Sequence, residues 1–379
     1  MAERLPLQGR RVAEVLATST GGVGTHVRAV LPALEAAGAD VRVCGPAATE
    51  ALFGFTAAGA AFAPVGISAG LSPAADARAV AALRRATAGT DLVHAHGLRA
   101  GLVAAAARRL GDRSRPLVLT LHNALPEGGG ALRRVLRRAE RATVRAADVV
   151  LAASGDLAEN AWRQGARDVR VAPVSAPRLP APARTAAEVR AELGVANGRP
   201  LVVAVGRLHP QKGYDVLLDA AARWARDPRP PLVAVAGDGP LQDELAARIA
   251  AERLPVVLLG RRSDVADLLA AADLAVLPSR WEARSLTAQE ALRAGTPLVA
   301  TRTGGLPELL GDGAQLVPVG DAAALADAVT DLLEDPASAR QLAEAGTRQA
   351  ATWPDEAATA RQLVALYREL LGAPGGDPR

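Results

Sequence analysis

Short runs of apolar residues alternate with amphipathic helical patterns along the whole chain, and this alternation predicts parallel β-sheets wound with helices. A first set of predicted strands covers residues 12–17, 41–44, 92–94, 117–121 and 149–152. A second set covers residues 201–205, 232–236, 256–259, 274–277 and 298–300. Because the two sets follow one another with similar spacing, we predict two doubly wound α/β domains.

A proline-rich stretch separates the two sets of strands. Residues 173–200 contain several prolines and few periodic apolar positions, as is typical of a domain boundary. We predict domains at residues 1–178 and 179–353, followed by a C-terminal helical segment, 354–379, that packs back across both. Doubly wound sheets bind ligands outside the carboxyl ends of their strands, so we expect both domains to face one interdomain cleft.

Two glutamates with seven residues between them follow the strand at 274–277. Glu282 lies in the turn, whereas Glu290 lies in the helix after it and could accept hydrogen bonds from a vicinal diol such as a ribose. Ser285 is predicted to cap this helix, and the N–H groups of Leu286 and Thr287 would then favour an anion such as a diphosphate. The alternative interpretation is that both glutamates are ordinary solvated carboxylates.

A second group of polar residues follows other predicted strands. Arg207 and Lys212 lie in a glycine-flanked loop, where a guanidinium and an ammonium suit a diphosphate. They could replace a metal ion, and the sequence contains no Asp-x-Asp pair, so we expect no metal requirement. Gly21 and Gly22 follow the first strand and allow close approach of a ligand to the backbone, before a helix predicted to begin near Thr25.

A nicotinamide dinucleotide site is disfavoured, because the full Gly-x-Gly-x-x-Gly spacing is absent and no acidic residue ends the second strand. His122 directly follows the strand at 117–121, where its imidazole could bond a sugar hydroxyl or a phosphate oxygen; a structural histidine is the alternative. We expect His94 to be structural and His96 to line the acceptor side. Arg261 is placed where it could contact a nucleobase.

The composition of the chain limits the classes of molecule that it is expected to bind. The 379 residues carry a formal charge of +4, but only 2% of them are aromatic, so no basic and aromatic platform for nucleic acid is expected. A single cysteine, an N-terminus unlike a secretory signal, and the absence of a long apolar run predict a cytoplasmic protein. The basic helical pattern from Arg133 to Arg145 is either a core helix with a solvated face or a peripheral contact with the inner face of the membrane.

Six segments together resemble the retaining glycosyltransferases of family 4, which have the GT-B fold. They are, in order, GGVGTH (21–26), DLVHAHG (91–97), TLHN (120–123), GRLHPQKG (206–213), AGDGP (236–240) and the glutamate pair through TGGLPE (303–308). The resemblance implies two Rossmann-like domains, with the N-terminal one on the acceptor side and the C-terminal one on the nucleotide-sugar donor side. It also implies transfer from a UDP- or GDP-linked sugar to an acceptor hydroxyl, with retention of configuration and no metal or tightly bound cofactor.

The resemblance also implies a role for particular residues. Glu282 would contact the transferred sugar, Glu290 the ribose, and His122 the donor sugar or its phosphate. The diphosphate would be held by Arg207, Lys212, Gly22 and the amides of Leu286 and Thr287. One departure is Arg284-Ser285, where family members often carry an aromatic residue and a glycine.

The acceptor is expected to be a small molecule, a glycan or a lipid-linked sugar. Two alternative functions stay open from the sequence. One is another GT-B enzyme, such as a sugar-nucleotide epimerase or a glycoside phosphorylase, and the other is a non-catalytic nucleotide-sugar-binding protein.

Overall fold

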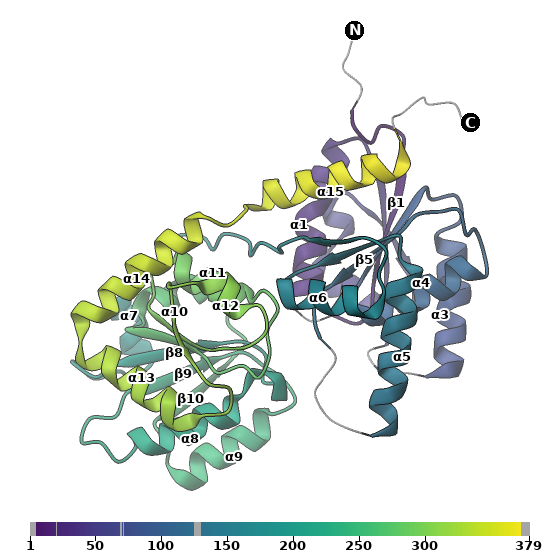
Figure 1. Cartoon of the computed structure of the whole chain (residues 1–379). Helices are drawn as coiled ribbons and strands as arrows, with labels where there is room; N and C mark the ends of the chain where they lie inside the picture. Colours follow the sequence, from purple (N-terminus) through teal and green to yellow (C-terminus); the bar gives the residue numbers. More distant parts are fainter. Residues whose placement is uncertain (1–4, 20, 69, 71, 125–129, 373–379) are drawn as a thin grey trace. The chain divides into compact units, whose positions relative to one another are not determined.

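The computed structural model describes residues 5–19, 21–68, 70, 72–124 and 130–372. The chain divides into two compact units, of which the first contains residues 1–175 and 354–379 and the second residues 176–353. Each unit is built on one parallel β-sheet with helices packed on it (Figure 1). The prediction of two doubly wound α/β domains is therefore confirmed.

The first unit has a seven-stranded sheet in the order β3-β2-β1-β4-β5-β6-β7. Its strands are β1 (Arg11–Leu16), β2 (Asp40–Gly45), β3 (Ala61–Pro64), β4 (Leu92–His96), β5 (Leu117–Leu121), β6 (Val149–Ala152) and β7 (Val169–Val171). All five predicted strands are present. The two strands that the sequence pattern did not predict, β3 and β7, are short edge strands with no buried residue. Strand β7 (VRV) contains an arginine, and β3 (AFAP) has no β-branched residue and ends in a proline.

The helices of the first unit include α1 and α15, which pack against each other (Figure 1). The set is α1 (Gly22–Ala36), α2 (Ala47–Phe53), α3 (Pro73–Ala86), α4 (Leu98–Arg109), α5 (Ala131–Ala146), α6 (Gly155–Gln164) and α15 (Glu356–Leu371), with a 3₁₀ turn at Thr56–Ala58. Helix α1 begins at Gly22 and not near Thr25, because Gly21 is its N-cap and the glycines themselves form its first turn. The predicted reach of residues 354–379 across both domains stays a prediction.

The second unit has a six-stranded sheet in the order β10-β9-β8-β11-β12-β13. Its strands are β8 (Leu201–Val205), β9 (Leu232–Ala236), β10 (Val256–Gly260), β11 (Leu274–Leu277), β12 (Leu298–Thr301) and β13 (Gln315–Val317). Its helices are α7 (Ala186–Glu192), α8 (Tyr214–Trp224), α9 (Gln242–Glu252), α10 (Val265–Ala271), α11 (Leu286–Arg293), α12 (Leu306–Leu310), α13 (Ala322–Glu334) and α14 (Pro336–Ala351), with a 3₁₀ turn at Pro210–Lys212. Edge strand β13 was not predicted.

Each sheet has one place where the strand order reverses. This switch point lies between β1 and β4 in the first unit and between β8 and β11 in the second. In doubly wound sheets ligands bind beyond the carboxyl ends of the strands at such a point. The fold therefore selects two short regions of the chain in each unit as candidate ligand contacts. No helix within the described residues is both long and apolar enough to cross a bilayer.

Candidate active site

The switch point of the second unit brings Lys212 and Glu282 into contact. Lys212 comes from the loop after β8 and Glu282 from the loop after β11, and Lys212 Nζ lies 2.6 Å from Glu282 Oε1. Ser279 Oγ donates to the same oxygen at 2.8 Å. Glu282 is only 7% exposed, so it is not a solvated surface carboxylate. Its Oε2 has no hydrogen-bond partner among the described residues and can accept from a ligand hydroxyl.

Two glycines hold these loops at close range. Gly213 has φ +66°, and a Cβ there would lie 2.1 Å from the carbonyl oxygen of Pro278. Gly304 has φ +52°, and a Cβ there would lie 2.0 Å from the carbonyl oxygen of Glu282, which also accepts from the N–H of Gly305 at 2.9 Å. Any side chain at either position would push a backbone away. The two glycines therefore fix the backbone on both sides of the Lys212–Glu282 contact.

Helix α11 begins at Leu286, shortly after Glu282 in the chain. Ser285 is its N-cap and its Oγ accepts from the N–H of Ala288 at 3.3 Å, which confirms the predicted cap. Leu286 and Thr287 occupy the first turn, where N–H groups have no intrahelical acceptor and the helix dipole favours negative charge. This end of α11 therefore adds a second attraction for an anion near Lys212.

Glu290 lies one turn further along α11 and is half-buried. Burial raises the pKa of Glu290, whereas the nearby cations Arg293 and Lys212 act in the opposite direction. A half-buried carboxylate that is not fully compensated is costly to the folded state. The charged form of Glu290 therefore costs the ligand-free fold stability.

Replacing Glu290 with glutamine is expected to raise the thermal stability of the ligand-free protein at pH 7 to 8. The raised pKa means that the folded state holds this proton more tightly than the unfolded state does, so ionisation of Glu290 destabilises the fold as the pH rises. Glutamine removes that cost. The gain in Tm should vanish below about pH 4, where both states of the wild type are protonated. Equal Tm values for the two proteins across this range would contradict the assigned burial of the charge.

Two arginines that were predicted to bind the ligand follow strands but do not take part in the contact between Lys212 and Glu282. Arg207 follows β8 and Arg261 follows β10, and both side chains are exposed. Neither forms an ion pair with another residue in the described part of the chain. Arg207 shares its loop with Lys212, but β10 is an edge strand and lies two strands away from β8. The structure thus groups Arg207 with the candidate site and does not bring Arg261 into contact with it.

Arg284 occupies the turn where the family often has an aromatic residue. Its guanidinium carbon lies 5.8 Å from the ring centre of Trp353, and that of Arg293 lies 5.7 Å from the same ring. Burial lowers the pKa of Arg284 to about 10, and Arg293 acts in the same direction while Glu308 opposes it. The turn is therefore filled by a guanidinium packed on an indole.

The other predicted residues lie at or next to the switch point of the first unit. Gly21 and Gly22 follow β1 and open α1, and His122 follows β5. His122 Nε2 lies 3.2 Å from His96 Nδ1, and His96 is itself buried at the end of β4. His122 is thus joined to a buried histidine and is only partly exposed.

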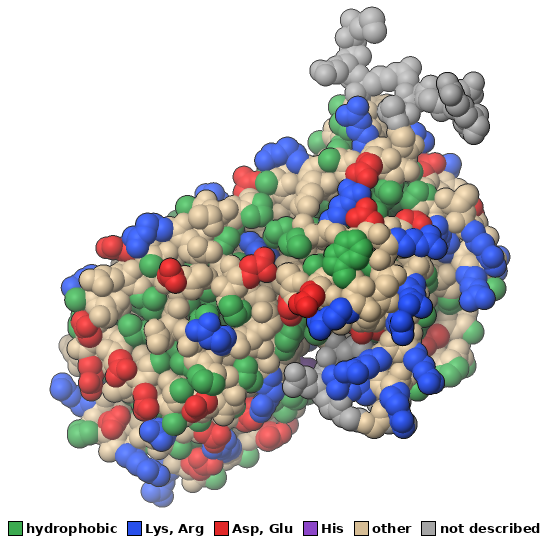
Figure 2. Space-filling view, in the orientation of Figure 1, with side chains coloured by type: hydrophobic (Ala, Val, Ile, Leu, Met, Phe, Trp, Pro, Cys, Tyr) green, Lys and Arg blue, Asp and Glu red, His purple; other side chains and the backbone are tan. Residues whose placement is uncertain are grey.

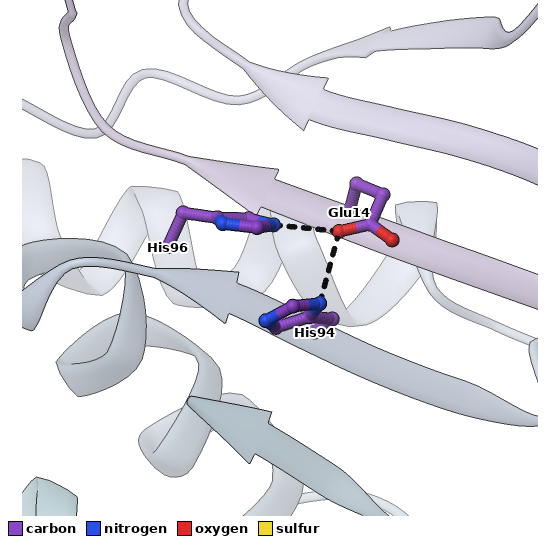
Figure 3. Close-up of side chains that lie close together, drawn as sticks. All are labelled: Glu14, His94 and His96. Carbon is purple, nitrogen blue, oxygen red and sulfur yellow. Dashed lines mark hydrogen bonds and ion pairs between the residues drawn. The ribbon is translucent and has the colours of Figure 1, made fainter. Parts of the chain in front are cut away.

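Sequence reasoning missed the centre of this cluster, which is Glu14 on β1. Figure 3 shows one oxygen of its carboxylate facing a ring nitrogen of both His94 and His96, and all three side chains are buried. Tyr367 on α15 donates to Glu14 Oε1 at 2.7 Å. A glutamate within the apolar run RVAEVL was the one available signal, because a charged residue on a central strand needs a partner.

The two halves of the chain each match a known protein family. Residues 21–177 match the family described as glycosyl transferase 4-like domain, and residues 186–349 match glycosyl transferases group 1. The Anabaena protein HepE, whose structure was solved with UDP-glucose, superposes with a TM-score of 0.79 at 24% identity, covering 95% of this chain and 99% of that one. The fold is therefore GT-B, as expected.

Two curated relatives carry the assignment further. Alpha-maltose-1-phosphate synthase of Mycobacterium tuberculosis is 33% identical over 326 residues, which cover 76% of this chain and 81% of the relative. Glycogen synthase of the same organism is 32% identical, and the match covers 92% of each chain. The chain belongs to the family 4-like glycosyltransferases and is a glycosyltransferase enzyme.

Proposed function

We propose that the enzyme transfers a sugar from a UDP- or GDP-linked donor to an acceptor hydroxyl, with retention of configuration and without a metal ion. The observation that carries this proposal is the contact of Lys212 with the buried Glu282 beside the N-terminus of α11. A cation and a helix N-terminus suit a diphosphate, and an adjacent carboxylate with a free oxygen suits a sugar hydroxyl. One small region thus offers complementary groups to both halves of a nucleotide sugar.

The leaving diphosphate gains negative charge as the bond to the sugar breaks. Lys212, Arg207 and the N–H groups of Leu286 and Thr287 are arranged to stabilise that charge electrostatically. Phosphate would draw Lys212 toward itself, and Glu282 would then turn from its lysine to the sugar. Glu290, one turn deeper, would accept from the ribose hydroxyls.

The first unit would supply the remaining contacts. His122 would contact the donor sugar or its phosphate, and Gly21 and Gly22 would let the backbone approach the ligand. HepE was solved with UDP-glucose, which supports a nucleotide-sugar donor for this chain too. We propose a small molecule, a glycan or a lipid-linked sugar as acceptor, in the cytoplasm.

A panel of UDP-, GDP- and ADP-sugars tests the donor. One nucleotide series is expected to raise Tm, because a ligand that binds only the folded state stabilises it by mass action. The rise should persist in EDTA if no metal is needed. Release of the nucleoside diphosphate should then depend on an added acceptor, which an epimerase would not require. If none of these nucleotide sugars raises Tm at millimolar concentration, the proposal is contradicted.

Helix α5 favours a peripheral contact with an anionic membrane surface. Its exposed side chains include Arg134, Arg137, Arg138 and Arg141, and Val135 among them is 51% exposed. Figure 2 shows basic side chains gathered over this helix. Such a surface suits the charged head groups of the inner leaflet, and a lipid-linked acceptor would be presented there.

Liposome sedimentation tests this contact. The protein is expected to sediment with vesicles that contain anionic lipid, to stay in solution with neutral vesicles, and to be released by about 0.5 M salt. Replacing Arg134 and Arg138 with glutamine should weaken sedimentation, whereas Arg340→Gln on α14 serves as a matched control. Equal sedimentation of both variants would remove α5 from the contact.

A further inference from the structure

A continuous set of hydrogen bonds runs through the buried cluster of the first unit. Glu14 on β1 lies opposite His94 on β4 in the sheet register. His96 Nε2 lies 2.7 Å from Glu14 Oε2, and Tyr367 donates to Glu14 Oε1 at 2.7 Å. His94 contacts both Tyr367 Oη and Thr120 Oγ1 at 2.6 Å. The set ends at His122, whose Nε2 lies 3.2 Å from His96 Nδ1.

The protons on His94 follow from its partners. Tyr367 has one hydroxyl proton and gives it to Glu14, so its oxygen must accept from His94 Nδ1–H. His94 Nε2 then accepts from the hydroxyl of Thr120. His94 is therefore neutral, which agrees with the lowering of its pKa by burial and by the neighbouring His96.

The charge of Glu14 has to be balanced nearby. Its carboxylate is buried with 0% exposure and receives protons on both oxygens, from Tyr367 and from His96, which is the pattern of an ionised acceptor. A buried charge is tolerated when an opposite charge is paired with it. Because His94 is neutral, the positive charge falls to His96. Burial and then His96 lower the pKa of His122 as well, and that of His26 to about 3.

We propose that a buried Glu14–His96 ion pair fixes the ring of His122 as the Nδ1–H tautomer. The cationic His96 donates through Nε2 to Glu14 and through Nδ1 to His122 Nε2, which leaves the single proton of His122 on Nδ1. His122 then presents an N–H donor to its ligand, as suits a phosphate oxygen or a sugar hydroxyl. Only this last step rests on the proposed function. Glu14 and His96 are positioning residues.

A metal ion held by Glu14, His94 and His96 is a rival arrangement, since their ligand atoms all lie within 4.8 Å of one another. Two ligands of a tetrahedral zinc ion, at bond lengths of about 2.0 to 2.1 Å, lie about 3.3 Å apart. Glu14 and His96 are 2.7 Å apart, which is a hydrogen-bond distance (Figure 3). Tyr367 and Thr120 already occupy both nitrogens of His94, so the observed contacts favour the ion pair.

Ring-nitrogen NMR tests the proposal directly. The chain has five histidines, so proton-to-¹⁵N correlation spectra can be assigned with a His122→Asn variant. The wild type is expected to show neutral His122 protonated at Nδ1 and His96 protonated at both nitrogens. In Glu14→Gln the negative charge is lost, and His96 should become neutral, with one of its two ring nitrogens unprotonated.

Two controls separate the ion pair from general packing. Thr120→Val removes only the bond to His94 Nε2 and should leave His122 at Nδ1–H. Tyr367→Phe removes a bond to Glu14 but keeps its charge, and should also leave the tautomer unchanged. A neutral His96 in the wild type would overturn the proposal, as would a wild-type His122 protonated at Nε2.

A second arm measures the effect on sugar transfer. Glu14→Gln is expected to lower kcat about tenfold or more, comparable to losing an outer partner that orients a functional histidine. Thr120→Val should retain wild-type kcat. Neutralisation of His96 in Glu14→Gln without any loss of kcat would overturn the positioning role while leaving the ion pair in place. If no donor is ever turned over, the NMR result still decides the ion pair, so failure of the proposed function is recognised separately.

Discussion

Replacing Glu282 with glutamine is expected to lower kcat by about 10²- to 10³-fold, a loss typical of removing one group that stabilises charge or position in the transition state. Glutamine keeps the shape of the side chain and an oxygen that can accept from Ser279 and Lys212. It loses the negative charge that would hold the sugar as its bond to the diphosphate breaks. The fold should therefore survive, and the loss should appear in kcat more than in the donor KM.

The measurement is nucleoside diphosphate release under saturating donor and acceptor, paired with a thermal melt. Glu334→Gln, an exposed glutamate at the end of α13, is the matched control and should behave as wild type. Full activity of Glu282→Gln would remove Glu282 from the reaction. A melt that collapses in this variant alone would instead mean that the carboxylate serves the fold.

Replacing Lys212 with alanine is expected to lower kcat/KM by about 10²-fold or more, because the diphosphate loses a cation in the region where negative charge develops. The change should also leave the carboxylate of Glu282, 7% exposed, without its cationic partner. A modest fall in Tm is therefore expected, since a buried charge loses its compensation. Lys212→Ala combined with Glu282→Gln should recover part of that stability and none of the activity.

A Lys212→Arg variant sharpens this prediction. A guanidinium carries the same charge but is planar and wider than an ammonium, so it should not reproduce the compact contact with Glu282 Oε1 at 2.6 Å. Activity is expected to stay well below that of the wild type, with donor affinity partly restored. Arg226→Ala, which removes an exposed cation after α8, is the control and should retain activity. Wild-type turnover by Lys212→Ala would contradict the role of Lys212.

The central strands of both sheets could be predicted because each is a buried apolar run. Three of the four edge strands, β3, β7 and β13, were not predicted, since they are short and mostly unburied, whereas the fourth, β10 (VVLLG), is a β-branched and apolar run and was predicted. The N-cap role of Ser285 could also be predicted, because helix capping depends on a few neighbouring residues. Features that depend on residues close together in the sequence could therefore be predicted.

Contacts between segments that lie far apart in the sequence could not be predicted in the same way. Lys212 and Glu282 are 70 residues apart, and their contact depends on β8 and β11 being neighbours at the switch point. Glu14 looked like an exception within an apolar strand, and its partner Tyr367 is 353 residues away on α15. The sequence identified chemically capable side chains, but the order of the strands decides which of them meet.

The contact of Lys212 with Glu282 also has a practical consequence, because Lys212 is the only lysine in the 379 residues. An amine-acylating reagent therefore has a single side-chain target in the native sequence, and that target lies in the proposed diphosphate site. Bound nucleotide should shield it, so the extent of acylation of one peptide, read by mass spectrometry, would report donor occupancy. Ligand binding could then be followed in the unmodified enzyme, without a variant and without turnover.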